Sequence, residues 1–245
     1  MELTNKIVLI TGGKGFLGGY FIKALQEAGA TVIITDRGED ADVQMDVTNA
    51  SSIAAAFTKA KEMHGKIDIV INNAAIDPKF EPDAAQNTKL FENYPEELIR
   101  QSLDVNLLGY TLVAQEAVRH MLEAGSGNII NISSIYGVTG PDQRIYPNGT
   151  QKPVDYFLTK GGVVMLTKFL ATTYGDKGIR ANTLTLGGVL HGHGKEFTDA
   201  YGTRTPMGRM ANPEEVGGPL VFLASDASSY MTGSNLVVDG GWTAW

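Results

Sequence analysis

The sequence predicts a single α/β domain in which about seven parallel strands form a doubly wound sheet covered by helices on both faces. Short β-branched runs alternate with longer stretches of helical periodicity, as in parallel sheets with crossover helices. The 245 residues are 43% hydrophobic and contain no repeat and no linker. We therefore interpret residues 1–245 as one domain with a sizeable core.

The N-terminal half is expected to alternate between strands and helices. Its first helix has apolar residues at positions 17, 21, 22, 25 and 28, which is helical spacing, and Gly29 follows it. The second helix has Asn49 as its N-cap and Gly65 after its last turn. In chain order, we expect a strand at Lys6–Thr11, a helix at Phe16–Ala28, strands at Thr31–Thr35 and Val43–Met45, a helix at Asn49–His64 and a strand at Ile67–Ile71.

The C-terminal half continues the alternation with longer helices. Each expected helix has a proline near its first residue, where the missing amide N–H costs no hydrogen bond. The pair Gly161-Gly162 predicts close packing of the second of these helices on a neighbour. We expect helices at Pro95–Ala124, Pro153–Tyr174 and Pro213–Ser225, and strands at Asn128–Ile132, Ile179–Leu186 and Asn235–Val238.

Three long connections interrupt this pattern. Asp77–Tyr94 and Gly137–Lys152 contain prolines and many polar residues, and Gly187–Met210 is rich in glycine and histidine. Long loops in compact domains are usually functional or disordered. We expect an inserted polar loop at about 141–152 and a mobile loop at about 187–210.

The composition excludes several classes of protein. Lys and Arg number 20 and Asp and Glu 27, so the net charge is −7 and there is no cationic excess for binding nucleic acid. The absence of cysteine excludes disulfides, thiolate catalysis and Cys-ligated metals. No apolar run approaches the ~20 residues of a membrane span, and the N-terminus lacks a signal-peptide pattern. We expect a cytoplasmic protein.

A glycine-rich turn after the first strand is typical of a phosphate-binding loop. Gly12, Gly15 and Gly18 have G-x-x-G-x-x-G spacing and open a helix whose positive end attracts an anion. Asp36 ends the second strand, 18 residues beyond Gly18, near the position where an acidic residue binds the ribose of a dinucleotide. A strand–helix turn that merely needs glycine is the plainer alternative.

The charges near this loop bear on the choice of dinucleotide. Asp36 favours NAD, because its carboxylate would repel the 2′-phosphate of NADP. Lys14 and Arg37 are nearby cations that favour NADP. We expect NAD, with NADP as the alternative.

Tyr156 and Lys160 form a candidate acid–base pair. They lie four residues apart in an expected helix, so their side chains share a face. A tyrosine pKa of about 10 is too high for a base near neutrality, and a nearby ammonium group lowers it. Such a pair can exchange a proton with an alcohol. The same spacing is common on helices, so by itself it does not indicate function.

Nearly the whole chain resembles the short-chain dehydrogenase/reductase family, in its compact form of about 250 residues. The motifs that carry the resemblance stand in the family's order. They are Thr11–Gly18, Asp46-Val47, Asn72-Asn73-Ala74-Ala75, Val105-Asn106-Leu107, Ile132-Ser133-Ser134 and Tyr156-Phe157-Leu158-Thr159-Lys160, followed by Phe222–Asp226, Thr232-Gly233 and Val238–Gly241. The resemblance implies a Rossmann-like fold and an NAD(P)-dependent oxidoreductase that interconverts a secondary alcohol and a ketone.

The resemblance also implies the catalytic roles. Tyr156 would be the general acid/base, and Lys160 would bind the nicotinamide ribose and lower the tyrosine pKa. Ser134, rather than its neighbour Ser133, would hydrogen-bond the substrate oxygen. Asn106 would hold a water that relays protons from Lys160 to solvent.

Further residues are implied to contact the cofactor. Asp46 and Val47 would contact adenine, and Asn73 and Ala74 would line the cofactor and brace the sheet. The full expected set is Gly12, Lys14, Gly15, Phe16, Leu17, Gly18, Asp36, Arg37, Asp46, Val47, Asn73, Ala74, Ala75, Tyr156, Lys160, Gly187, Val189 and His191.

Two departures from the family pattern concern the cofactor loops. Phe16 stands where a glycine is expected, and Gly15 is used instead. This spacing is similar to that of a longer, sugar-nucleotide-modifying branch. His191 stands where a threonine often meets the nicotinamide amide, and Leu186 replaces a proline before Gly187.

A third departure concerns the substrate side. Ser134 and Tyr156 are 22 residues apart, wider than usual, because of the polar loop Asp142–Lys152. The mobile loop 187–210, which closes over the substrate in this family, is also polar. These loops favour a sugar or polyol over a steroid or fatty-acyl group, with solvated surface or subunit contact as the alternative. The expected substrate-binding residues are Ser134, Tyr136, Arg144, Tyr156 and His193.

Two local patterns are interpreted without a functional role. His191-Gly192-His193 lacks a cysteine or a clear carboxylate partner, so we expect no metal site. Asn148-Gly149-Thr150 matches a glycosylation sequon, but we interpret Asn148-Gly149 as a turn.

Two other functions remain open from the sequence. A non-catalytic NAD(H)-binding regulator is opposed by the complete catalytic set, and a cofactor-retaining sugar isomerase or dehydratase is supported by the glycine spacing. The family resemblance implies a homotetramer packed through the helices at Pro95–Ala124 and Pro153–Tyr174. Trp242 and Trp245 would then be buried against a partner subunit. We expect no nucleic-acid or membrane partner.

Overall fold

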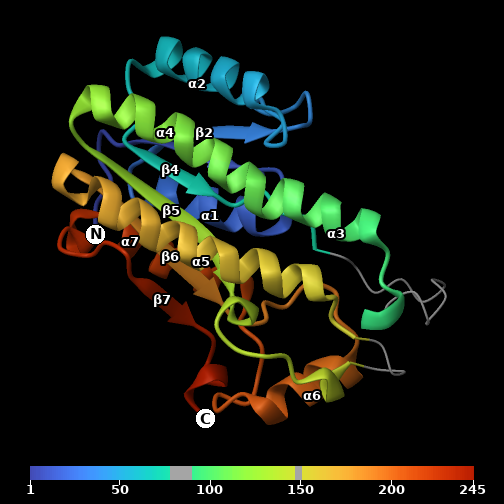
Figure 1. Cartoon of the computed structure of the whole chain (residues 1–245). Helices are drawn as coiled ribbons and strands as arrows, with labels where there is room; N and C mark the ends of the chain where they lie inside the picture. Colours follow the sequence, from blue (N-terminus) through green and yellow to red (C-terminus); the bar gives the residue numbers. More distant parts are fainter. Residues whose placement is uncertain (78–89, 147–150) are drawn as a thin grey trace.

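The computed structural model describes residues 1–77, 90–146 and 151–245 (Figure 1). Within these residues, parallel strands form one seven-stranded sheet in the order β3-β2-β1-β4-β5-β6-β7. The strands are β1 (Ile7–Thr11), β2 (Thr31–Asp36), β3 (Val43–Gln44), β4 (Ile69–Asn72), β5 (Gly127–Ser134), β6 (Ile179–Leu186) and β7 (Asn235–Val238). The predicted α/β fold class with a Rossmann-like sheet is confirmed. The strand order reverses between β1 and β4, which is where ligands bind in such sheets.

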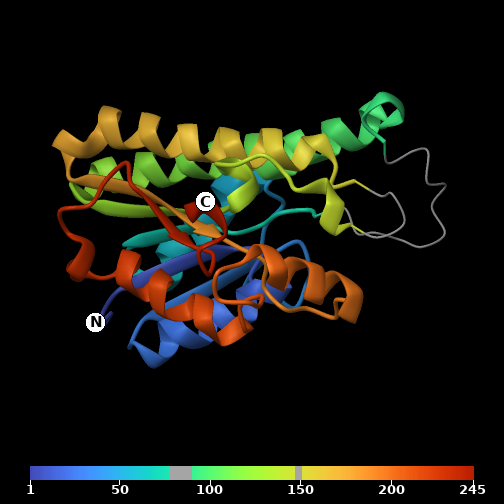
Figure 2. The ribbon, with the colours of Figure 1, turned by 90° about the horizontal axis from the view of Figure 1, so that it is seen from below.

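Helices cover both faces of the sheet (Figures 1 and 2). On one face lie α2, α4 and α5, and on the other lie α1 and α7. The helices are α1 (Phe16–Glu27), α2 (Ala50–His64), α3 (Glu96–Leu103), α4 (Tyr110–Ala124), α5 (Val154–Tyr174), α6 (Lys195–Arg204) and α7 (Gly217–Ala224). None of these helices is long and apolar enough to cross a membrane.

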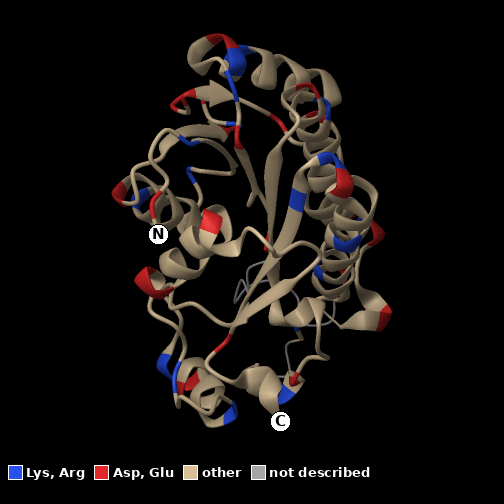
Figure 3. Cartoon of the chain, turned by 90° about the vertical axis from the view of Figure 1, so that its left-hand side faces the viewer, with Lys and Arg blue, Asp and Glu red and all other residues tan. Residues whose placement is uncertain are grey.

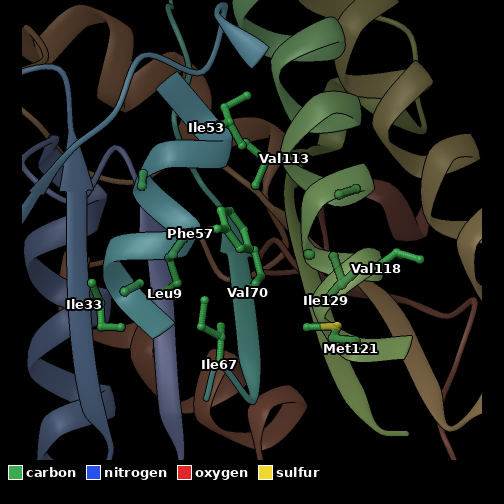
Figure 4. Packing of buried hydrophobic residues seen from close by; sticks show 14 of the residues in the cluster. Leu9, Ile33, Ile53, Phe57, Ile67, Val70, Val113, Val118, Met121 and Ile129 are labelled. Carbon is green, nitrogen blue, oxygen red and sulfur yellow. The ribbon is translucent and has the colours of Figure 1, made fainter. Parts of the chain in front are cut away.

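The core consists of two apolar layers because successive strand residues face opposite sides of the sheet. Leu9 of β1 packs toward Phe57 of α2 and Val113 of α4 (Figure 4). Its neighbours Val8 and Ile10 belong to the opposite layer, with residues of α1 and α7. Charged residues are interspersed over the helices and loops in the view of Figure 3.

A chain of buried hydrogen bonds ties α5 to the middle of the sheet. Asn72 of β4 donates to Asn131 of β5 at 2.8 Å. Asn131 donates to the Thr167 hydroxyl of α5, and Thr183 of β6 donates to the same hydroxyl, both at 2.8 Å. Because an unpaired buried polar group is costly, this chain sets where α5 lies along β5.

The predicted continuous helix at Pro95–Ala124 is interrupted. A π-helical turn, η3 (Asp104–Gly109), separates α3 from α4. The extra residue of such a turn shifts the helix face and often marks a functional site. Gly109 lies so close to Val47 that an added Cβ would be 3.0 Å from its Cγ2 atom. Periodicity does not reveal a turn of this kind.

The prediction of a loop throughout Gly187–Met210 is wrong, because Lys195–Arg204 forms α6. Phe197 and Tyr201, four residues apart, lie on one face of α6 and contact each other with ring centroids 6.1 Å apart. Tyr201 also stacks on Trp242, with centroids 4.4 Å apart. The spacing of these two aromatics is the signal from which α6 could have been predicted.

The two C-terminal tryptophans differ in their surroundings. Trp242 is only 7% exposed and is buried within its own chain, so it needs no partner subunit to cover it. Trp245 is 78% exposed, although its indole N–H donates to the Arg204 carbonyl. The predicted turn at Asn148-Gly149, most of the loop Asp77–Tyr94 and part of the inserted loop lie outside the described residues.

Candidate active site

The predicted catalytic residues meet at the carboxyl end of β5. Tyr156, in the first turn of α5, shares a hydrogen bond with Ser134, the last residue of β5. Its ring lies edge-on to Tyr136, with centroids 6.4 Å apart. Burial raises the pKa of Tyr156, the Asp77 carboxylate raises it further, and the bond with Ser134 lowers it.

The structure distinguishes the two neighbouring serines. Ser134 Oγ accepts a hydrogen bond from the Tyr136 backbone N–H at 3.3 Å and faces Tyr156. Ser133 Oγ instead donates to the Lys160 carbonyl at 3.0 Å. Ser133 therefore holds the catalytic helix, whereas Ser134 is the hydroxyl placed beside the tyrosine.

Lys160 is buried beneath Tyr156. Its Nζ donates to the Ile132 carbonyl at 3.1 Å and lies 5.8 Å from the centroid of the Tyr156 ring. Burial disfavours the ammonium form and lowers the pKa of Lys160 to about 8. Burial has the largest effect on the pKa of Tyr156, and Lys160 is not among the groups that shift it. The lowering of this pKa by Lys160 therefore stays a prediction.

Asn106, in the π-helical turn, is fully buried. Its Oδ1 accepts from the Ile76 backbone N–H at 2.8 Å, and its Nδ2 donates to the Ile76 carbonyl at 2.9 Å. The side chain thus positions the segment that follows β4. The predicted role of Asn106 in holding a water stays a prediction.

Lys152 and Asp77 are site residues that the sequence analysis missed. Lys152 Nζ forms an ion pair with Asp77 and lies 4.2 Å from the centroid of the Tyr156 ring. Lys152 is buried, and it also lines a cavity of about 540 Å³ together with Tyr136, Gln143 and Phe157. Its place four residues before Tyr156 is the one sequence signal for this contact.

The predicted substrate residues separate into two groups. Tyr136 shares a 2.8 Å hydrogen bond with Tyr146, and His193 stacks on Phe197 of α6, which also contacts Tyr146. Partial burial and the neighbouring His191 lower the pKa of His193. These residues gather beside Tyr156.

Arg144 is not brought to the catalytic tyrosine. Its guanidinium pairs with Asp142 at 2.7 Å, and Arg204 of α6 binds the same carboxylate at 2.8 Å. The Arg144 side chain is 79% exposed and lines a different cavity, of about 420 Å³, with Trp242 and Trp245. The Asp142 carboxylate, which binds both arginines, therefore links the inserted loop to α6.

The glycine-rich loop has the geometry of a phosphate-binding turn. Gly12 has a φ of +62°, and an added Cβ would lie 2.6 Å from the Ala74 Cα. Asn73 Nδ2 donates to the carbonyls of Thr11 and Gly12, which braces the loop against the end of β4. The first turn of α1 has no side-chain cap and no acidic residue. Its free N–H groups and positive end suit the pyrophosphate of a dinucleotide.

Asp36 lies beside this loop. Its carboxylate accepts hydrogen bonds from the backbone N–H groups of Lys14 at 3.0 Å and Arg37 at 2.7 Å. The Lys14 ammonium pairs with Asp40 at 3.1 Å. The Asp36 carboxylate is therefore fixed beside the glycine-rich loop. Of the two cations that favour NADP, Lys14 is already paired with Asp40.

The remaining predicted cofactor residues surround the same edge of the sheet. Phe16, which opens α1, stacks on His191 with ring centroids 3.8 Å apart, so two departures from the family pattern contact each other. Val189 bridges to Ala211. Asp46 has its pKa lowered by hydrogen bonds from Thr48. The other predicted cofactor residues lie near the ends of strands or the start of α1. Gly15, Leu17 and Gly18 lie at the start of α1, Val47 and Ala75 come shortly after β3 and β4, and Gly187 directly follows β6.

The part of the chain that the structure describes contains no cluster of three or more His, Asp or Glu side chains suited to a metal ion. The nearby histidines His191 and His193 are engaged with aromatic rings, and the His193 Nδ1 accepts the His191 backbone N–H at 3.1 Å.

Comparison with known proteins identifies the family. A family model described as enoyl-(acyl carrier protein) reductase matches residues 17–243. The cis-4-hydroxycyclohexanecarboxylate dehydrogenase of Sinomonas cyclohexanicum is 34% identical to this chain, over 98% of the chain and 97% of its own length. The chain belongs to the short-chain dehydrogenase/reductase family and is an NAD(P)-dependent dehydrogenase acting on CH–OH groups.

Two solved structures share the fold. A short-chain dehydrogenase of Leptospira borgpetersenii with bound NAD⁺ has a TM-score of 0.88 and 35% identity, covering 99% of this chain and 94% of its own. A gluconate 5-dehydrogenase of Burkholderia cenocepacia, in complex with NADP and tartrate, has a TM-score of 0.86 and 31% identity, covering 100% and 97%. Other relatives are named for polyols and for hydroxysteroids, so similarity alone does not select the substrate or the dinucleotide.

Gly137 permits the close contact between the turn after β5 and α5. A Cβ at this position would lie 2.6 Å from the Lys160 carbonyl oxygen. We predict that Gly137→Ala displaces α5 relative to Ser134 and lowers kcat on the order of 100-fold, because misplacement of a catalytic group by about 1 Å costs that much.

Steady-state kinetics and thermal unfolding would check this prediction. Gly218→Ala is the matched control, because an added Cβ there meets nothing within 4 Å. Unchanged kcat in Gly137→Ala would contradict the requirement for close contact.

Proposed function

We propose that this dehydrogenase interconverts a secondary alcohol and a ketone on a small polar substrate, a sugar or polyol. The observation that carries the proposal is the grouping of Ser134 and Lys160 around Tyr156: a hydrogen bond with Ser134 lowers the pKa of Tyr156, and Lys160 Nζ lies 5.8 Å from the centroid of its ring. Bound nicotinamide would supply the hydride acceptor or donor. The glycine loop, the end of β4 and the segment after β6 would hold the dinucleotide.

Tyr156 is the group that moves the substrate proton in this proposal. In the oxidation direction its phenolate takes the proton of the substrate hydroxyl, and in reduction its hydroxyl protonates the forming alkoxide. Ser134 shares the hydrogen bond and keeps the substrate oxygen beside the phenol. Because burial raises the pKa of Tyr156, a positive charge is needed to make the phenolate accessible.

Lys160 of α5 supplies this charge in the scheme, although Lys152 Nζ lies nearer to the Tyr156 ring centroid, at 4.2 Å against 5.8 Å. Its ammonium would bind the ribose hydroxyls of the cofactor and stabilise the phenolate. Asn106 would complete a proton path from Lys160 to solvent. The lining beside Tyr156 supports a polar substrate, since it includes Tyr136, Tyr146 and the Lys152–Asp77 pair.

We predict that Tyr156→Phe lowers turnover by about 10²–10⁴-fold, the range of a lost general acid–base group. The affinity for NADH should stay within a few-fold, because only one hydroxyl is removed. Oxidation of a panel of polyols, aldoses, hydroxy acids and hydroxysteroids would be followed with NAD and NADP, and NADH binding by fluorescence.

Loss of NADH binding in Tyr156→Phe would show that Tyr156 has a structural role instead. Turnover of the hydroxysteroids alone would refute the proposed substrate class. Tight binding of NADH with no turnover of any alcohol by the wild type would refute the proposed reaction.

We propose NAD as the preferred cofactor because of Asp36. The carboxylate is fixed by the backbone of Lys14 and Arg37, where it can accept ribose hydroxyls and repel a 2′-phosphate. We predict that Asp36→Ala lowers the ratio of kcat/KM for NAD over NADP by about 10-fold or more, since hydrogen bonds to charged groups have this strength. An unchanged ratio would assign the preference to other residues.

We propose a homotetramer as the assembly. Apolar side chains along η3, α4 and α5 remain exposed in the single chain, and a partner's helices could cover them. They are Leu108 (45% exposed), Leu122 (44%), Leu158 (55%), Met165 (61%) and Phe169 (59%). We predict a tetramer in a light-scattering measurement at micromolar concentration, and a monomer would contradict the proposal.

A further inference from the structure

The ion pair of Lys152 and Asp77 takes no part in the proton transfer described above, although Lys152 contacts the ring of the catalytic tyrosine. The Lys152 ammonium lies against the ring face of Tyr156, with Nζ 4.2 Å from the ring centroid. The Lys152 side chain is 9% exposed, whereas that of Asp77 is 58% exposed. A buried cation is thus joined to a carboxylate that solvent or a ligand can reach.

Both members of the pair are held in place by their own neighbours. The Lys152 backbone N–H donates to Gln143 Oε1 at 2.9 Å, and Gln143 Nε2 donates to the Lys152 carbonyl at 3.2 Å. Asp77 directly follows Ile76, whose N–H and carbonyl are both bound by the buried Asn106 side chain. The pair is therefore preorganised, unlike a surface ion pair between two long side chains.

Asp77 lies near the catalytic groups, because it pairs with Lys152, whose ammonium lies 4.2 Å from the centroid of the Tyr156 ring. Its carboxylate raises the pKa of Tyr136, Tyr146 and Tyr156, three phenols that come from different parts of the chain. Lys152 also lines the cavity of about 540 Å³, which Tyr136 borders and Tyr156 and Asp77 do not, so Lys152 stands between this cavity and the ring of Tyr156. A substrate whose reacting carbon lies at Tyr156 would extend toward this pair.

The chemistry of the pair selects among substrate classes. An apolar substrate would desolvate Lys152 and Asp77 without giving them new partners, which is costly. A substrate carboxylate would gain from the ammonium but meet repulsion from Asp77. A neutral diol suits both charges, because one hydroxyl can donate to the carboxylate and the other can accept from the ammonium.

We propose that Lys152 and Asp77 form a hydroxyl-recognition subsite that selects alcohols with further neutral hydroxyl groups beside the reacting carbon. This inference deepens the proposed function and rests on it. The substrate class it names is that of neutral polyols and sugars, as distinct from hydroxy acids, steroids and simple alcohols. Lys152 and Asp77 are then substrate-binding residues, while the proton transfer remains with Tyr156.

The test compares four-carbon alcohols that differ in their neighbouring groups. The probes are 2-butanol, 2,3-butanediol, threitol and the acid threonate, each assayed with wild type, Lys152→Met and Asp77→Asn. Wild type should have a higher kcat/KM for threitol and 2,3-butanediol than for 2-butanol and threonate. Each variant should lose about 10- to 100-fold on the polyols, mostly through KM, because a charged hydrogen bond is removed. The ratio of kcat/KM for threitol over that for 2-butanol should fall by about 10-fold or more in each variant, because any change in the pKa of Tyr156 affects both alcohols and cancels in the ratio.

Two controls separate recognition from structural damage. Lys61→Met removes a cation from the exposed pair Lys61–Glu123, which joins α2 to α4 at 2.9 Å, and it should leave every substrate ratio unchanged. The Kd for NADH, measured by fluorescence without any alcohol, should be unaltered in Lys152→Met and Asp77→Asn. Since Asp77 is half-exposed, Asp77→Asn should fold even where Lys152→Met is destabilised.

Several outcomes would overturn the inference. An equal loss on all four probes would show that the pair acts through Tyr156 rather than on substrate hydroxyls. A gain on threonate in Asp77→Asn, with threitol unchanged, would make the subsite one for anions. Wild type that oxidises 2-butanol as efficiently as threitol would leave the dehydrogenase standing but refute the subsite. Wild type that binds NADH and oxidises no alcohol would refute the proposed function as well.

Discussion

The chain of buried hydrogen bonds from Asn72 through Asn131 to Thr167 is the constraint on which the site depends. These side chains lie inside the molecule, where a lost partner would cost about 1–3 kcal/mol. The helix α5 therefore has one favourable position along β5. That position places Tyr156 opposite Ser134 and directs Lys160 Nζ to the Ile132 carbonyl. The absence of a Cβ at Gly137 lets α5 approach this closely, and the hydrogen bond from Ser133 to the Lys160 carbonyl holds it there.

The two sides of the site are built in different ways. On the cofactor side, hydrogen bonds between side chains and the backbone join the ends of β1 and β4: the Asn73 backbone N–H donates to the Thr11 hydroxyl, and the Asn73 side chain donates to the Thr11 carbonyl. On the substrate side, aromatic rings of α6 and of the inserted loop pack together. The stack of Phe16 on His191 joins the two sides across the end of the sheet.

Burial shifts the pKa values of the two acid–base residues in opposite directions, raising that of Tyr156 and lowering that of Lys160. It disfavours the phenolate of Tyr156 and the ammonium of Lys160, because both are charged forms. The Asp77 carboxylate adds to this cost for Tyr156 and offsets part of it for Lys160, whereas the Lys152 ammonium adds to the cost for Lys160. Reactivity consequently depends on the sum of these charges and on those that a bound ligand adds.

The sequence by itself determined the fold class, the order of the elements and the residue types at the end of each strand. The alternation of short strands with helices predicts a parallel sheet, and in a parallel sheet the carboxyl ends of the strands lie at one edge. The sequence could not reveal the π-helical turn at Asn106, the ion pair between Arg144 and Asp142 or the contact of Lys152 with the Tyr156 ring. Asp142 and Arg144 are two residues apart and Lys152 and Tyr156 are four apart, yet spacing does not show which local contacts form. The choice depends on partners from distant segments, Arg204 for Asp142 and Asp77 for Lys152. Only the tertiary structure decides them, because side-chain distances and burial depend on how the layers pack.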